Sequence, residues 1–245
     1  EPNPMEFPAT GSQFGILDYC GFPKDEAYYL KSWWTSEPVL HILPHWNLDG
    51  HEGETISIWA YSNCEEVQLT VNGKRLGRKK MPANGHLEWD AVYKAGYIKA
   101  TGYTGGRKIM ETIIETASEP VNQKVTYDFL TEKGEWVFGS TALDKDAASG
   151  IVITSIKMTD SKGRFVPTAC ESFKFTAPDG YRIIGWGNGN PAFQDIERPV
   201  TYGISSSHAE GTPVPDLAAT SVQIRTFNGY AQVILERISK DFQTQ

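Results

Sequence analysis

Residues 55–61 have the sequence Thr-Ile-Ser-Ile-Trp-Ala-Tyr, and this stretch decides the fold class. Smaller apolar residues alternate in it with polar or aromatic ones, a period of two that is typical of a β-strand with one buried face. The buried face would contain Ile56, Ile58 and Ala60, and the opposite face would be mostly aromatic. The pattern therefore indicates a strand at the surface of a layered β structure.

Similar segments follow at short intervals. Runs rich in β-branched and aromatic residues occur at 39–43, 67–71, 87–93, 97–103 and 108–115. Turn pairs separate several of them, including Asn72-Gly73, Asn84-Gly85 and Gly105-Gly106, and these residue types tolerate the positive φ angles of tight hairpin turns. Strands at this close spacing, with no helical pattern between them, favour a β-sandwich.

A second series of strand-like segments follows a short polar linker at 116–120. Its members are residues 121–130, 136–138, 151–159, 173–176, 182–186, 222–226 and 231–238. Residues 190–219 contain four Pro residues and show no periodic pattern, which predicts a long insertion. We predict a mainly β protein of two tandem immunoglobulin-like β-sandwiches. The expected parts are a loop-plus-helix segment at 1–36, one sandwich at 37–117 and a second at 118–245 that contains the insertion.

The N-terminal segment differs from the rest of the chain. Residues 1–22 are rich in Pro, Gly and aromatic residues, which predicts an irregular surface loop. Pro23 and two following acidic residues suit the N-terminus of a helix, so we expect a helix over residues 24–34. Trp33 and Trp34 belong to its aromatic face, and a short helix with such a face requires a large surface to pack on.

Composition narrows the function classes. The chain has 245 residues and a formal net charge of −7, and its 23 basic and 30 acidic side chains are interspersed. This interspersion predicts no basic face for nucleic acid and no polybasic membrane stripe. No apolar run approaches the roughly 20 residues that span a bilayer. A secretory signal peptide, with a charged segment before an apolar one, is also lacking in this sequence.

Seven Trp residues make sugar stacking a candidate function, because an exposed indole ring can lie flat against a pyranose. The Gly/Asn-rich loop at 185–190 presents one such ring. The alternative interpretation for Trp186 is that it packs in the core. For Trp33 and Trp34, the alternative is packing between the helix and the first sandwich. The candidate carbohydrate-binding residues are Trp186, Asn188, Asn190, Trp33 and Trp34.

The sequence contains no recognisable catalytic, metal or cofactor motif. His41 and His45 are four residues apart, but Pro44 lies between them and the context is a strand, so they do not share a helix face. The acidic residues form no short motif of the kind that would mark a pair of hydrolytic carboxylates. We therefore predict no catalytic residue, no metal site and no cofactor.

Three groups of short sequence segments occur in order along the chain. The first group comprises residues 12–25, 28–29 and 32–34. The second comprises residues 40–47 and 71–74. The third comprises residues 166–169, 187–191 and 227–231. Together they resemble the C-terminal part of bacterial glycoside hydrolase family 2 enzymes, the β-galactosidase type of Bacteroidetes. The first group resembles the end of the catalytic (β/α)8 barrel, the second the following immunoglobulin-like domain, and the third the terminal β-sandwich.

The resemblance implies a parent enzyme that is a retaining exo-glycosidase, in first place a β-galactosidase. In the family both catalytic glutamates come from earlier barrel strands, so neither maps onto this sequence and the chain alone is expected to be inactive. Residues 1–36 would be a remnant of the last barrel helix. The implied partner is the missing catalytic barrel of the same chain, and the implied location of the parent is periplasmic or extracellular.

A different class of function is left open by the same residues. The chain could be a carbohydrate-binding module with its own weak affinity for an oligo- or polysaccharide, through Trp186 or the Trp33/Trp34 pair. A purely structural spacer is the third alternative, because fold resemblance alone does not separate these roles.

Overall fold

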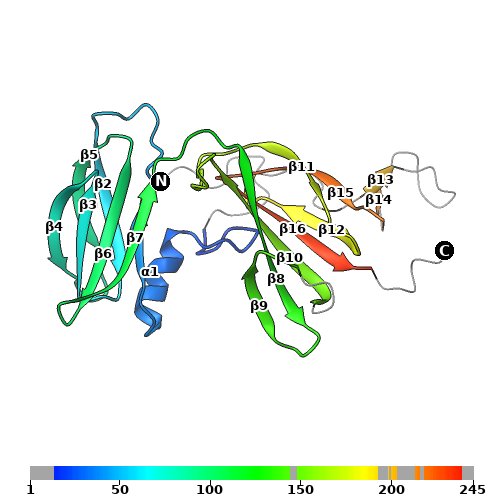
Figure 1. Ribbon diagram of the computed structural model, residues 1–245, viewed down its shortest axis with the longest axis horizontal. Helices are drawn as coiled ribbons and strands as arrows, with labels where there is room; N and C mark the ends of the chain where they lie inside the picture. Colours follow the sequence, from blue (N-terminus) through cyan, green and yellow to red (C-terminus); the bar gives the residue numbers. More distant parts are fainter. Residues whose placement is uncertain are drawn as a thin grey trace. The chain divides into compact units, whose positions relative to one another are not determined.

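The computed structural model describes residues 14–143, 148–192, 198, 200–202, 213–215 and 218–238. They are mainly β, and the strands that pair do so in antiparallel fashion. The chain divides into two compact units (Figure 1). The first comprises residues 14–119 and 160–167, and the second comprises the described residues of 120–159 and 168–238. The boundaries after residues 36 and 117 stay predictions.

The first unit is a sandwich of two sheets. One sheet has the order β1 (Leu40–Leu43), β2 (Thr55–Ser62), β5 (Leu87–Val92), and the other has the order β4 (Lys74–Lys80), β3 (Glu66–Val71), β6 (Tyr97–Thr104), β7 (Arg107–Glu115). Immunoglobulin-like domains also pair their first, second and fifth strands in one sheet. Ile58 and Ala60 are fully buried between the sheets, as the alternation in residues 55–61 predicts.

Hairpin turns form at Asn72-Gly73 and Gly105-Gly106, as predicted, but Asn84-Gly85 connects β4 to β5, which lie in different sheets, and so is no hairpin turn. Asn72 and Gly73 have φ angles of 47° and 83° and connect β3 to β4. The Asn72 side chain also accepts a hydrogen bond from Tyr97 N at 2.7 Å and donates one to Lys94 O at 3.0 Å. A Cβ atom on Gly96 would collide with Asn72 Oδ1, so glycine is needed at that position.

Two aromatic side chains, Trp46 and Tyr93, pack together in the first core and hydrogen-bond the backbone. Trp46 is fully buried and donates from Nε1 to Lys94 O at 3.1 Å. Tyr93 lies edge-on to it, with ring centroids 4.9 Å apart. The Tyr93 hydroxyl accepts a hydrogen bond from Leu48 N at 3.1 Å. It differs from the tyrosine corner of immunoglobulin-like domains, whose Tyr bonds backbone a few residues upstream, because this Tyr93 corner bonds a segment 45 residues earlier in the chain.

The predicted N-terminal helix is present as α1 (Asp25–Trp34), directly after Lys24. Asp25 and Glu26 lie in its first turn and Lys31 in its last, which complements the helix dipole. The helix contacts β1 and β2 and so belongs to the first unit.

The second unit has a five-stranded sheet and smaller ones. The large sheet has the order β12 (Tyr181–Gly187), β16 (Tyr230–Arg237), β10 (Ala148–Thr159), β8 (Asn122–Thr131), β9 (Trp136–Ser140), and β11 (Ser172–Thr176) pairs with β15 (Ser221–Arg225). Side chains from both sheets, including Val152, Leu235 and Ile224, form one buried core.

The predicted insertion at 190–219 is only partly described. Within it, β13 (Val200–Tyr202) pairs with β14 (Pro213–Pro215) in a short two-stranded ladder. Most of the remaining residues of this predicted insertion lie outside the described residues.

A buried carboxylate organises the loop at 160–167. Asp160 is fully buried and accepts hydrogen bonds from Ser118 N at 3.0 Å and Lys162 N at 2.9 Å. Arg164 Nη2 forms an ion pair with it at 2.6 Å. Burial by itself would raise the pKa of Asp160, but these hydrogen bonds outweigh burial and hold that pKa well below its usual range.

In the described part of the chain, no helix combines the length and apolar character needed to cross a bilayer.

Candidate functional site

Trp186 lies on β12 and is half-buried. It is the register partner of Val233, a fully buried residue of β16, and it packs against the core of the second sandwich. The ring therefore has one side in the core, and only part of it is accessible. Its role as a sugar platform stays a prediction.

The amide side chains beside Trp186 already bond the protein. Asn188 is buried, donates from Nδ2 to Arg225 O at 2.9 Å and accepts from Asn190 N at 3.0 Å. Asn190 accepts from Ala192 N through Oδ1 at 2.9 Å. Such bonds from an Asn side chain to the backbone two residues on form turns, so both amides help to shape the loop after β12.

The two helical Trp residues have different environments. The Trp34 side chain is 78% exposed, so it does not pack against the first sandwich. Trp33 is half-buried and lies edge-on to Tyr29, with ring centroids 6.4 Å apart. Its Nε1 atom is buried and, among the described residues, has no hydrogen-bond partner. The structure therefore does not bring the two rings together as one flat platform.

An aromatic layer joins α1 to the outer face of the β1–β2–β5 sheet. His41 stacks on Tyr28, with centroids 4.0 Å apart and planes at 3°, and its Nε2 lies 2.7 Å from Asp25 Oδ1. Tyr29 is edge-on to Tyr61 at 5.3 Å. Burial, with a smaller contribution from Asp25, raises the pKa of Tyr28. The layer is a structural contact that explains Tyr28 and Tyr29 of the helix, whereas exposed Trp34 is not part of it.

A polar cluster that the sequence motifs did not single out lies on the same sheet. His86 stacks on Trp59, with centroids 4.1 Å apart and planes at 19°. Trp59 Nε1 donates to Ser57 Oγ at 3.1 Å, and Ser57 Oγ donates to Glu88 Oε1 at 2.7 Å. The hydrogen bond from Ser57 is the main reason that the pKa of Glu88 is lowered. The sequence does contain a signal for this cluster, because Ser57 and Trp59 lie two residues apart on the non-core face of residues 55–61.

A second missed feature is an exposed aromatic pair on β9, the edge strand of the large sheet. Trp136 is 56% exposed and Phe138 is 74% exposed, and their rings are nearly parallel with centroids 5.7 Å apart. Val137, between them, is the partner of buried Phe129, so Trp136 and Phe138 point away from the core.

The described residues contain no group of three or more His, Cys, Asp or Glu side chains arranged to hold a metal ion.

The fold places the chain among proteins built from tandem immunoglobulin-like β-sandwiches. Residues 53–110, which cover most of the first sandwich, match a family described as a domain of unknown function, DUF4982.

Comparisons with known proteins identify the family. A β-galactosidase from Bacteroides ovatus is 36% identical over 211 residues, which are 83% of this chain and 23% of the relative. A putative β-glucuronidase from Formosa agariphila is 30% identical over 181 residues, or 72% of this chain and 16% of the relative. The chain is homologous to a part of glycoside hydrolase family 2 enzymes of the β-galactosidase and β-glucuronidase types.

Solved structures agree. A β-glycosidase from Bacteroides vulgatus superposes with a TM-score of 0.74 and 26% identity, covering 96% of this chain and 26% of that one. A family 2 member from Bacteroides cellulosilyticus, with a TM-score of 0.64 and 23% identity, supports the fold and covers 91% of this chain and 29% of that one. The chain thus spans about a quarter of the length of these relatives.

Proposed function

We propose that this chain is a non-catalytic C-terminal region of a retaining family 2 glycosidase, in first place a β-galactosidase. Its role is to support the catalytic barrel, its partner in the same protein, and to shape the rim of the active site. The segment that contains α1 would be the remnant of the last barrel helix. We place the parent enzyme in the periplasm or outside the cell.

One observation carries this proposal. The similarity to the Bacteroides vulgatus β-glycosidase extends over 96% of this chain but over only 26% of that enzyme. The curated β-galactosidase relative gives the same asymmetry, with 83% against 23%. What this chain contains therefore corresponds to a minor part of such enzymes. Hydrolysis with retention requires two carboxyl groups about 5–5.5 Å apart on either side of the scissile bond, and we expect the remainder of the parent to supply them.

Activity assays test the non-catalytic role. The purified chain should not hydrolyse 4-nitrophenyl β-galactoside or 4-nitrophenyl β-glucuronide above the buffer rate, while the Bacteroides ovatus enzyme serves as the positive control. Turnover by the chain that persists through repeated purification would overturn the proposal.

Replacing the matching region of a relative with this chain tests the supporting role. The matching region can be deleted from the Bacteroides ovatus enzyme and replaced by this chain. We expect the deletion to lose solubility or activity and the replacement to recover part of it. A deletion variant as active and as heat-stable as the intact enzyme would show that the region supports nothing.

A further inference from the structure

The two sheets of the first sandwich differ strongly in charge. The strands of the β4–β3–β6–β7 sheet contain eight basic and three acidic residues. The strands of the β1–β2–β5 sheet contain two acidic residues and no basic one. The interspersed charges of the sequence are therefore sorted by the fold, because β1, β2 and β5 enter one sheet and β3, β4, β6 and β7 enter the other. The expectation of no basic face does not hold for this sheet.

Strand register shows which side chains share the outer face. Three rows cross the sheet from β4 to β7. The rows are Lys80–Glu66–Tyr103–Lys108, Arg78–Gln68–Thr101–Glu111 and Arg75–Thr70–Lys99–Ile113. Each row has a cation on β4, and β6 or β7 adds Lys99 and Lys108. We call these five cations, Arg75, Arg78, Lys80, Lys99 and Lys108, the basic face.

Two of the three acidic residues on these strands, Glu66 and Glu111, are already matched, and the third, Glu115, is exposed at the end of β7. Glu66 pairs with Arg78 at 2.5 Å. Glu111 lies 2.9 Å from Lys108 Nζ and 3.7 Å from Lys99 Nζ, and the hydrogen bond from Lys108 is the main cause of its lowered pKa. Arg75 and Lys80 are exposed and form no ion pair among the described residues. The face thus has positive charge in excess of its own acids.

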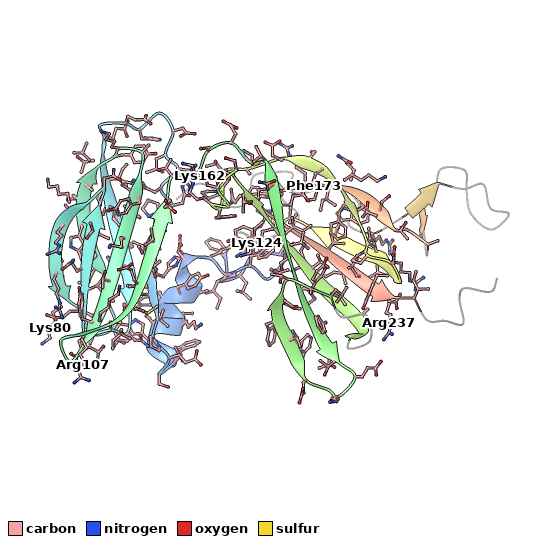
Figure 2. The ribbon with its side chains drawn as sticks, viewed as in Figure 1. Lys80, Arg107, Lys124, Lys162, Phe173 and Arg237 are labelled. Carbon is pink, nitrogen blue, oxygen red and sulfur yellow. The ribbon has the colours of Figure 1, made fainter. Side chains whose placement is uncertain are left out.

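An edge-strand explanation covers only part of this pattern. Lysines on an edge strand such as β4 prevent strand-to-strand aggregation. Lys99 lies on β6, however, which has β3 and β7 on its two sides and exposes no free edge. Figure 2 shows Lys80 of β4 and Arg107, at the start of β7, projecting outward from the same end of the sheet. The cations therefore extend across the sheet and not only along its edge.

We propose that the basic face binds an anionic polysaccharide, a chain of uronic acid sugars with a carboxylate on each ring. The inference rests on the proposed function, because a glycosidase region meets glycans. Charge complementarity selects the occupant: cations two residues apart along β4 are roughly 7 Å apart, and a polyuronate repeats its carboxylates along an extended chain. Gln68, which is half-buried, lies between the cations and supplies a hydrogen-bonding group for sugar hydroxyls.

Fluorescence anisotropy with end-labelled oligogalacturonate tests the proposal on the whole chain. We expect saturable binding that weakens with added salt, and at least about tenfold weaker binding for the methyl-esterified oligomer, which keeps the sugars but lacks the charges. The Arg75→Gln/Lys80→Gln variant should bind about tenfold more weakly, and its salt dependence should fall by roughly one unit of slope for each cation removed. Equal binding of the esterified oligomer would overturn the proposal.

Matched variants separate position from net charge. Lys124→Gln/Lys133→Gln changes the charge by the same amount in the second unit and should bind like the original chain. Arg75→Lys/Lys80→Arg keeps both charges and should retain affinity. A loss as large in the Lys124/Lys133 variant would overturn the placement. Equal affinity for an oligothymidylate of the same charge, lost in the same variant, would overturn the carbohydrate assignment.

The two proposals fail in different ways. A chain that ignores oligogalacturonate but restores the Bacteroides ovatus deletion variant contradicts the basic-face proposal and leaves the supporting role intact. A chain that hydrolyses the chromogenic glycosides contradicts the proposed function and leaves the measured affinity of the face unchanged.

Discussion

The two sandwiches build their cores in the same way but differ on their outer faces. In the first, one outer face is charged and the other is partly covered by α1 through the layer around His41 and Tyr61. In the second, the large sheet leaves Trp136 56% and Ile151 45% exposed. Alternation fixes what lies inside a sandwich, whereas the outward positions are free to differ. The outward positions are therefore where contacts with other molecules are encoded.

The largest effects should come from the cores, equally in both sandwiches. Trp46→Ala in the first should lower the free energy of unfolding by about 3–5 kcal/mol, and Leu235→Ala in the second by about 2–5 kcal/mol. Both residues are fully buried. Urea denaturation at neutral pH measures the change, with exposed Trp34→Ala as the control at less than about 0.5 kcal/mol. A near-neutral Leu235→Ala would show that the second core is loosely packed.

Asp160→Asn should give the next largest loss of stability at pH 7, because Arg164 would keep its charge without a carboxylate partner. A carboxyl whose pKa falls on folding stabilises the fold above its unfolded pKa of about 3.9, and the stabilisation disappears as the pH falls toward the folded pKa. The difference between variant and original chain should therefore shrink below about pH 4. Urea midpoints at pH 7, 5 and 3 measure it.

Asp90→Asn, an exposed position on β5, is the matched control and should change little at any of these pH values. A difference for Asp160→Asn that stays constant from pH 7 to pH 3 would contradict the lowered pKa.

Tyr93→Phe should have a smaller effect that is confined to the first sandwich. It removes the hydroxyl that accepts from Leu48 N while keeping the ring against Trp46. The expected loss is about 1–3 kcal/mol, the typical consequence of leaving such a backbone group without its partner. Tyr103→Phe on the exposed sheet of the same sandwich is the control. Equal effects for the two variants would mean that the corner adds nothing to stability.

Trp136→Ser/Phe138→Ser should have the smallest effect on folding, within about 0.5 kcal/mol for each site. The same variant should reduce any self-association seen by sedimentation velocity, because exposed apolar patches promote association. Phe14→Ser, which removes an exposed aromatic from the first unit, gives the comparison. A large loss of stability in the β9 variant would mean that these rings are part of the second core.

Much of the fold follows from the sequence where alternation and turn residues agree. The strand at residues 55–61 and the turn at Asn72-Gly73 are examples, and both are present. The strand β4 was not predicted, because five basic residues in Lys74–Lys80 hide the two-residue period. An edge strand with a solvated outer side needs few apolar residues, so hydrophobic periodicity does not report it.

The candidate site was less predictable because its residues depend on which strands share a sheet. A period of two tells that Trp186 points to one face, but not that this face is the core side beside Val233. Likewise, the sequence places Lys80 and Lys108 far apart, and only the pairing of β4, β3, β6 and β7 brings them into one row. Counting charges along the chain does not report this row, because the count takes no account of which strands pair.

The loop at 160–167 leaves β10 of the second unit and yet belongs to the first, where Asp160 bonds Ser118. The first unit is therefore encoded in two separate stretches of sequence. A single cut after Glu119 would not release it whole, because its last piece begins at Asp160, 41 residues further on and directly after the longest strand of the other unit. A recombination event with its breakpoint between the two sandwiches would therefore separate residues 160–167 from the unit to which they belong.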